Sequence, residues 1–171
     1  VWEGLLFETG GSYNRNKLVR EAAFYWADGT RIDFNALHTA DGGAVTNPAG
    51  TLGSQLAAAP VFQGFARLRY EYPWLNYHVF GQFGATHQSQ SLASTDRLSE
   101  DLQGNSIAYV LPEFTTYDAA LGIRNSTWQV QAYGSNLSDT RAQLYANYHQ
   151  AYKAVTVSRP RTVGLRIGFK F

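Results

Sequence analysis

The sequence predicts an all-β protein, and more narrowly part of an antiparallel transmembrane β-barrel. Three observations lead to this fold class. Apolar and polar side chains alternate with a period of two along six stretches of the chain. Long and short connections alternate between those stretches, and the last stretch continues to Phe171 without a polar tail.

The alternation is clearest in the last stretch, at 161–171. One parity is apolar and consists of Val163, Leu165, Ile167, Phe169 and Phe171. The other parity consists of Thr162, Gly164, Arg166, Gly168 and Lys170. A helix with about 3.6 residues per turn would spread the apolar set around its axis. We therefore expect a strand with one apolar face and one polar face.

Five earlier stretches alternate in the same way, with four apolar exceptions on the polar faces: Leu6, Phe65, Phe80 and Tyr133. Runs rich in Tyr, Phe, Val and Thr favour strands over helices. No stretch of the chain predicts a helix. The six predicted strands lie at about 3–14, 61–72, 77–90, 112–124, 127–136 and 160–171.

The connections between the predicted strands differ sharply in length. Two are tight, at 73–76 and at about 125–126, whereas the other three are long, at about 20–59, 91–106 and 137–159. Short periplasmic turns and long extracellular loops are typical of bacterial outer-membrane barrels. If Phe171 lies at the periplasmic rim, both tight turns are periplasmic and all three long loops are extracellular. We therefore expect a bacterial outer-membrane location.

Two other architectures also fit an alternating pattern. A soluble ligand-binding barrel alternates with its apolar face inward, but here the polar face combines glycines with charges, as a wet interior tolerates. A complete small barrel with a structural or adhesive role needs roughly eight strands, and a brief alternation at 31–37 could supply more. A piece of a larger barrel is the simpler interpretation, because open sheet edges are costly in hydrocarbon.

Composition excludes several classes of function. The chain has no Cys, so it has neither a disulfide framework nor a thiolate metal site. It also has no Met, from which we expect that Val1 follows a removed signal peptide or further upstream sequence. The net charge of +1 gives no reason to expect nucleic acid. No stretch approaches the roughly 18–20 apolar residues of a spanning helix.

No catalytic or metal-binding motif is present. The four histidines, His38, His78, His87 and His149, do not have the spacing of a zinc motif. No G-x-S-x-G or related pattern orients a serine nucleophile. We therefore expect no enzyme activity, no metal and no cofactor.

Ligand contact is the function expected of the long loops. The last one combines aromatic rings with positive charge, which would suit an anionic or aromatic ligand, in Tyr145, Tyr148, His149, Tyr152 and Lys153. The alternative is an aromatic rim at the membrane interface. The polar strand faces carry charges that either pair with one another or bind another part of the protein: Glu8, Arg67, Arg69, Glu71, Asp118, Arg124 and Arg166.

Three ordered blocks resemble the last strands of TonB-dependent outer-membrane receptors. They are LPEFTTYD at 111–118, NLSDTR at 136–141 and RPRTVG at 159–164, followed by alternation to a terminal Phe. The resemblance implies a barrel of about 22 strands, of which this chain would supply about the last six. It also implies an N-terminal plug and further strands before Val1, and contact with TonB through that missing part. The expected activity is energised uptake of an iron–siderophore complex, or otherwise of cobalamin or a glycan.

The end of the chain also resembles the signal read by the barrel-assembly machinery. Thr162, Gly164, Ile167 and Phe169 fit that signal two residues inward from the terminus. With Phe171 as the final hydrophobic residue, the glycine position falls on Arg166, which departs from the pattern. Any final strand that faces lipid alternates in a similar way, so this alternative stays open.

Overall fold

The computed structural model describes residues 3–43, 45, 47–93, 109–147 and 154–170. Ten β-strands and one turn of 3-10 helix lie in these ranges. The prediction of an all-β antiparallel fold is confirmed. No helix among the described residues is long and apolar enough to cross a membrane.

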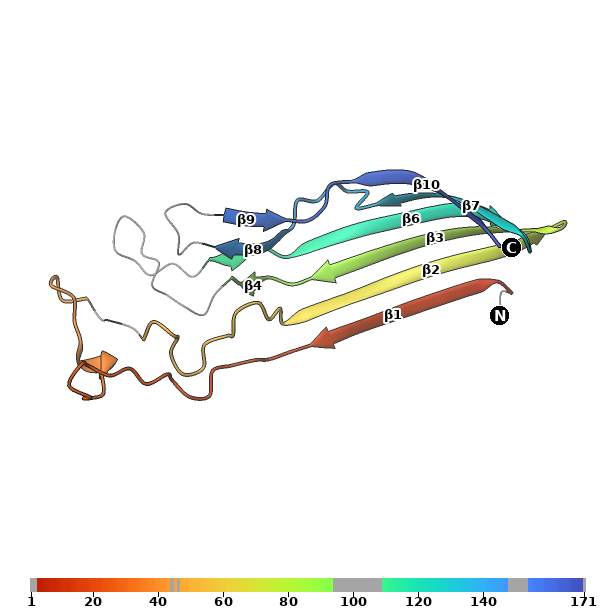
Figure 1. Ribbon diagram of the computed structural model, residues 1–171. Coiled ribbons are helices and arrows are strands. Elements are labelled where there is room, and N and C mark those ends of the chain that lie inside the picture. Colours follow the sequence, from red (N-terminus) through yellow and green to blue (C-terminus); the bar gives the residue numbers. More distant parts are fainter. Residues whose placement is uncertain (1–2, 44, 46, 94–108, 148–153, 171) are drawn as a thin grey trace.

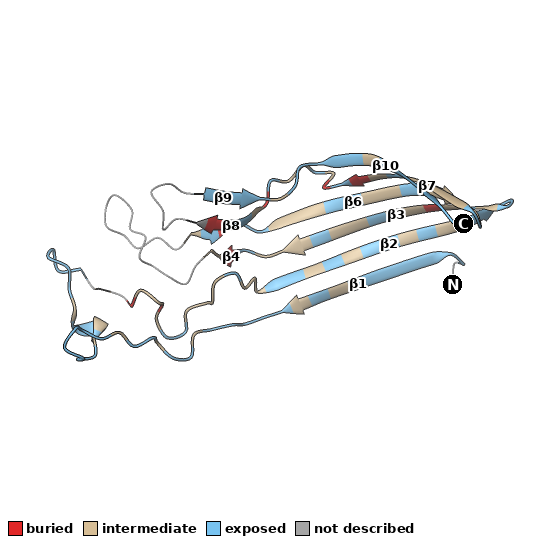
Figure 2. Cartoon of the chain, viewed as in Figure 1, coloured by how far each residue is buried: buried red, intermediate tan, exposed pale blue. Residues whose placement is uncertain are grey.

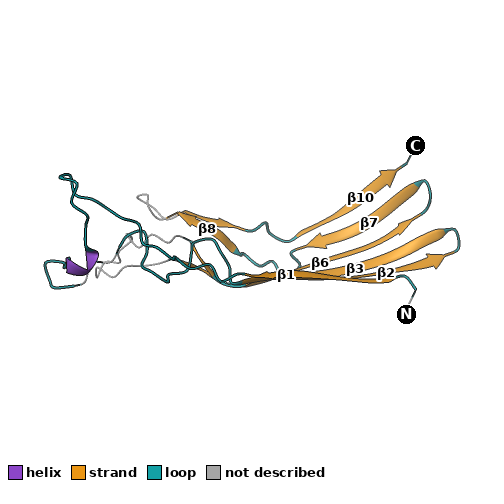
Figure 3. Ribbon diagram, turned by 90° about the horizontal axis from the view of Figure 1, so that it is seen from below, coloured by secondary structure: helices purple, strands orange, loops and turns teal. Residues whose placement is uncertain are grey.

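Six long strands form one antiparallel sheet. They are β1 (Leu5–Tyr13), β2 (Phe62–Trp74), β3 (Tyr77–Gln88), β6 (Phe114–Arg124), β7 (Trp128–Ser135) and β10 (Thr162–Phe169). Each pairs with the next long strand along the chain, and β7 and β10 rise away from the line of β1–β3, so the sheet is curved (Figure 1, Figure 3). Their bounds lie within two residues of the predicted ranges. The sheet is open, with β1 and β10 at its edges, so closure into a barrel stays a prediction.

The tight turns and the long connections lie at opposite ends of the sheet, here called the turn end and the loop end (Figure 1). β1 begins and β10 ends at the turn end. The turn between β2 and β3 places Leu75 at φ 56°, a left-handed conformation that leucine seldom adopts. In the turn between β6 and β7, the Asn125 side-chain oxygen accepts the backbone N–H groups of Thr127 at 2.9 Å and Trp128 at 2.8 Å. Asn is favoured in turns for this reason.

The long connections contain structure that the sequence did not predict. Two hairpins form there, β4 (Ser91–Leu92) with β5 (Val110–Leu111) and β8 (Gln143–Asn147) with β9 (Ala154–Val157). The first connection contains the 3-10 turn η1 (Phe34–Ala36).

The brief alternation at 31–37 does not form the extra strand that it suggested. The Asp33 side chain accepts the backbone N–H of Asn35 at 3.0 Å, and this bond caps η1. Such local side-chain bonds compete with strand pairing. The ladder there is limited to an isolated bridge between Tyr25 and Arg31.

The cross-strand register sorts the side chains of the six-stranded sheet into two faces. One row of directly paired residues crosses all six strands: Leu5, Tyr70, Gly81, Leu121, Ala132 and Leu165. The face to which this row belongs, here called the apolar face, carries no Asp, Glu, Lys or Arg in any of these strands. The opposite face, here called the charged face, carries every such residue: Glu8, Arg67, Arg69, Glu71, Asp118, Arg124 and Arg166.

The apolar face is exposed. Val163 and Leu165 each keep 73% of their surface exposed, and Phe169 keeps 65%. Figure 2 shows the same exposure along β1 and β10. Among the described residues, Phe80 on the charged face is the only large side chain of the sheet that is fully buried. The sheet therefore has almost no core of its own.

Three of the four apolar exceptions are aromatic rings, and each lies directly opposite a glycine: Phe65 opposite Gly10, Phe80 opposite Gly122, and Tyr133 opposite Gly164. A Cβ on Gly122 would lie 2.5 Å from the Phe80 ring, so the ring occupies the space that the glycine leaves. The Arg69 guanidinium covers this ring at 4.4 Å from its centroid. Such aromatic–glycine pairs protect a glycine within a sheet.

Candidate functional site

The long connections form a small layer with its own buried residues. Ser91 of β4 is 3% exposed, and Leu111 of β5 is 4% exposed. Ala142 and Ala146, beside and within β8, are each 4% exposed. Figure 2 shows these buried positions at the loop end. The described parts of the loops are thus packed against one another.

Hydrogen bonds connect the three long connections in series. The Ala58 N–H donates to the Leu92 carbonyl at 2.7 Å, which joins the first connection to β4. The Ala93 N–H donates to the Tyr109 carbonyl at 2.9 Å. The Tyr109 hydroxyl donates to the side-chain oxygen of Gln143, which joins the second connection to β8. These bonds link the three connections into one layer, here called the loop-end layer.

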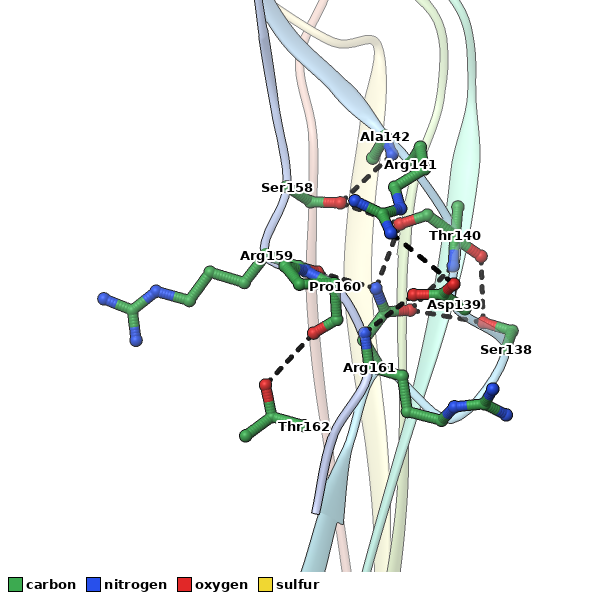
Figure 4. Close-up of polar contacts among 11 residues, drawn as sticks. Ser138, Asp139, Thr140, Arg141, Ala142, Ser158, Arg159, Pro160, Arg161 and Thr162 are labelled. Carbon is green, nitrogen blue, oxygen red and sulfur yellow. Dashed lines mark hydrogen bonds and ion pairs between the residues drawn. The ribbon is translucent and has the colours of Figure 1, made fainter.

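The base of the last connection is organised around Asn136, which is 7% exposed and has φ 50°. Its amide Nδ2 donates to the carbonyls of Thr140 at 3.0 Å and Arg159 at 2.8 Å (Figure 4). Its Oδ1 accepts the Thr140 N–H at 3.0 Å and the Ser138 hydroxyl at 3.4 Å. We call residues 136–142 and 158–161 the Asn136 junction. Asn tolerates the left-handed conformation better than most residues, which suits it to this position.

The junction is attached to strand β6. The Asn136 backbone N–H donates to Asp118 Oδ1 at 2.9 Å. The Leu137 N–H donates to the Tyr117 carbonyl at 2.8 Å. Asp118 belongs to the charged face, and its Oδ1 accepts this hydrogen bond from the junction in place of forming an ion pair.

Two further side chains close the junction (Figure 4). The Ser158 hydroxyl donates to the Thr140 carbonyl at 2.8 Å and accepts the Ala142 N–H at 3.1 Å. Asp139 Oδ1 accepts the Arg161 backbone N–H at 2.8 Å. This bond is the largest cause that holds the pKa of Asp139 below its usual value; burial opposes it, and the nearby Arg141 and Arg161 charges add to the lowering.

The charged face carries a second polar cluster, near the turn end. Glu71, whose side chain is 20% exposed, accepts from Arg124 Nε at 2.9 Å. The Arg69 guanidinium lies 3.3 Å from the same carboxylate and His78 Nδ1 lies 3.4 Å from it. One carboxylate therefore serves two arginines and a histidine from three strands.

The other charges of this face are arranged more loosely. Glu8 and Arg67 lie 3.4 Å apart with both side chains about half exposed. The Arg166 guanidinium lies 5.5 Å from the centre of the Tyr133 ring. A hollow of about 610 Å³, lined by Glu8, Arg67 and Asp118 among others, opens on this face. The sequence did not decide whether the charged residues of this face pair with one another. Five of the seven form ion pairs within the sheet: Glu8, Arg67, Arg69, Glu71 and Arg124.

The predicted ligand residues fall only partly within the described chain. Tyr145 lies in β8 with 53% of its surface exposed, whereas Tyr148, His149, Tyr152 and Lys153 lie outside the described residues. Of the predicted assembly signal, Thr162 and Gly164 lie on the charged face of β10, and Ile167 and Phe169 lie on its apolar face. Phe171 is outside the described residues. The ligand site and the assembly signal both remain predictions.

Sequence reasoning did not identify the junction as a site, although it noted the run at 136–141. A cluster of Asn, Ser, Asp and Thr directly after a strand indicates side-chain bonding to the backbone.

Within the described residues, no group of three or more His, Asp or Glu side chains is placed to hold a metal. His87 contacts the Thr115 hydroxyl through Nδ1 at 2.9 Å.

The fold is similar to that of one solved receptor. The chain matches the crystal structure of the siderophore receptor PiuA from Acinetobacter baumannii with a TM-score of 0.63 and 18% sequence identity. The match covers 100% of this chain and 20% of the receptor chain, so the chain spans about a fifth of that protein's length. At this identity the match establishes a shared fold. No family model matches the sequence, and no significant match was found among curated proteins.

Proposed function

We propose that the chain is the C-terminal part of a TonB-dependent outer-membrane receptor that takes up a scarce small ligand. The observation that carries the proposal is the separation of charge between the two faces of the sheet. All seven Asp, Glu, Lys and Arg side chains of the six long strands lie on one face. A charged side chain facing the bilayer midplane costs about 2–4 kcal/mol, so the uncharged face is the one suited to lipid.

The proposal places further strands beside this sheet. β1 and β10 each have one unpaired edge among the described residues. Unpaired backbone groups in hydrocarbon cost several kcal/mol each, so both edges need partner strands. A barrel of about 22 strands, with this chain as about the last six, agrees with the match to 20% of a receptor chain.

The partners follow from this placement. The apolar face contacts outer-membrane lipid, and the charged face contacts the N-terminal plug. TonB acts through the missing N-terminal part, and the barrel-assembly machinery reads the signal in β10. The last residue lies at the periplasmic rim, and the loop-end layer faces outward toward the ligand. The proposal includes no catalytic step, cofactor or nucleic acid.

An iron–siderophore complex is the first candidate ligand, with cobalamin or a glycan as the alternatives. The similarity to a siderophore receptor supports this order. The exposed Tyr145 ring at the loop end also suits a flat or aromatic ligand.

Uptake by cells that carry or lack the gene for the full-length protein tests the proposal. The probes are radiolabelled ferric complexes of one catecholate and one hydroxamate siderophore, together with cyanocobalamin. We expect deletion to abolish uptake of one probe, and a protonophore to stop uptake while surface binding persists. If neither the gene deletion nor the protonophore reduced the uptake of any probe, the result would contradict the proposal. A mature outer-membrane protein of only 171 residues would instead favour the complete small barrel.

A further inference from the structure

We infer that the Asn136 junction is a positioning site, which fixes the β8–β9 hairpin and the loop-end layer in one pose for ligand contact. The role in ligand contact rests on the proposed function, whereas the fixing of the pose does not. Asn136 itself acts through the hairpin and contacts no ligand in this scheme.

The junction holds the hairpin at both of its ends. Thr140 and Ala142 lead into β8, while Ser158 and Arg159 follow β9. The Asn136 amide donates to the carbonyls of Thr140 and Arg159, and therefore bridges the two segments. The Ser158 hydroxyl makes a second bridge between the same segments. A hairpin fixed at both ends of its base cannot swing about either one.

The Asn136 side chain is buried and its bonds to Thr140 and Arg159 are partly buried, whereas the bond between Asp139 and Arg161 is exposed. Asn136 is 7% exposed and Ala142 is 4% exposed. Within the described residues, no buried side-chain nitrogen or oxygen lacks a hydrogen-bond partner. Buried and fully satisfied polar networks impose one geometry, since any displaced donor or acceptor loses a bond that water does not replace.

Hydrogen bonds connect the fixed hairpin to the rest of the loop-end layer. Gln143, the first residue of β8, accepts from the Tyr109 hydroxyl just before β5. The Tyr109 carbonyl in turn accepts the Ala93 N–H, and the Leu92 carbonyl of β4 accepts the Ala58 N–H. A binding surface that is already ordered loses less entropy when a ligand binds, so it binds more tightly.

The backbone at Asn136 allows its two roles to be separated. With φ 50°, position 136 favours Asn or Gly. Asn136→Gly keeps the backbone conformation accessible and removes the side-chain amide bonds. Asn125 at the opposite end is a matched control, because its side chain also bonds the backbone, by accepting two N–H groups, but lies far from the hairpin.

Distances between two spin labels test the positioning role in the full-length protein. The chain contains no Cys, so within it labels attach only at introduced sites. We place one at Leu144 in β8, which is 48% exposed, and one at Leu121 in the middle of β6, which is 63% exposed and belongs neither to the turn nor to the junction. We expect one narrow distribution in the parent and in Asn125→Gly, and a distribution about twofold broader in Asn136→Gly. Equal widths in all three would overturn the inference.

A second variant keeps the test decisive if Asn136→Gly fails to insert. Ser158→Ala removes the bonds to Thr140 and Ala142 and leaves the Asn136 amide in place. We expect it to broaden the same distance distribution to a smaller extent. An unchanged distribution in an inserted Ser158→Ala protein would contradict the positioning role.

Ligand binding then separates the inference from the proposed function. For the siderophore complex that the cells take up, we expect Asn136→Gly to weaken binding about tenfold through faster dissociation, because loop ordering must then accompany binding. The maximal uptake rate per inserted receptor should not change. Broadened distances with unchanged affinity would refute ligand contact by this hairpin and leave the uptake function intact. A failure to find any ligand would refute the proposed function, while the distance measurement would still decide the positioning role.

Discussion

The six-stranded sheet and the loop-end layer bury their residues in different ways. In the sheet, side chains are sorted by face, and Phe80 is the one large side chain that is fully buried among the described residues. In the loop-end layer, polar residues such as Ser91 and Asn136 are buried, and the Asn136 side chain is hydrogen-bonded. The sheet leaves its apolar face exposed, whereas the loop-end layer is packed and hydrogen-bonded within itself.

The difference assigns separate sources of stability to the two regions. The exposed apolar face stabilises the protein only when an apolar environment covers it, because the hydrophobic effect depends on the area removed from water. The loop-end layer gains from bonds between its own groups, since the partners of Asn136 all lie in the described chain. Changes of face should therefore affect insertion, and changes at the junction should affect loop geometry.

The largest expected effect comes from a charge on the apolar face. Leu121 lies in the middle of β6 on that face with 63% of its surface exposed. We expect Leu121→Arg to destabilise the inserted full-length protein by about 2–4 kcal/mol, as for arginine at the bilayer midplane. Urea titration of the protein folded into phospholipid vesicles measures this change.

Ala120→Arg is the matched control, because Ala120 is the adjacent residue and lies on the charged face opposite Gln82. We expect it to have the smaller effect. If Ala120→Arg proved costly while Leu121→Arg assembled normally, the assignment of the two faces would be reversed.

The next effect concerns packing on the charged face. A Cβ at Gly122 would lie 2.5 Å from the Phe80 ring and 2.7 Å from the Val130 carbonyl oxygen. We expect Gly122→Ala to cost about 1–3 kcal/mol, as overpacking generally does. Gly168→Ala is the control, because no atom lies within 4 Å of its added Cβ. Equal urea midpoints for the two variants would show that the Phe80 ring does not depend on the glycine.

A smaller effect is expected at the carboxylate of Glu71. Glu71→Gln leaves Arg69 and Arg124 without their anionic partner, and we expect a loss of about 1 kcal/mol because both arginines are partly exposed. Glu8→Gln removes a single, more exposed pair with Arg67 and should cost less. The same vesicle titration compares them, and a larger loss in Glu8→Gln would contradict the ranking.

The sheet was predictable from sequence because its signal is periodic and local. A period of two marks each long strand, and it also assigns Leu121 and Leu165 to the same face before any register is known. The aromatic exceptions looked like errors in the pattern. Only the register showed that Phe80 lies opposite Gly122, since these two residues belong to different strands.

The loop end was less predictable for two physical reasons. β4 and β5 have two residues each, too few to show a period, and the alternation of β8 is interrupted by a register shift between Gln143 and Tyr145. The Asn136 junction depends on a bond to the Arg159 carbonyl, which lies 23 residues away in sequence. The run at 136–141 indicated side-chain bonding, but its distant partner was not visible in the sequence.

The smallest expected effect is the pH dependence of the junction at Asp139. The Arg161 N–H, together with the Arg141 and Arg161 charges, lowers the pKa of this carboxyl, so its ionised form stabilises the folded junction. That contribution is complete above the usual Asp pKa of about 4 and is lost as the pH falls through the lowered folded value. We expect the hydrogen-exchange protection factor of the Arg161 amide to be constant from neutral pH to about pH 5 and to decrease at lower pH. Asp139→Asn keeps an acceptor oxygen and does not titrate, so its protection should not decrease in this window. The same decrease in both proteins would show that other groups control the junction.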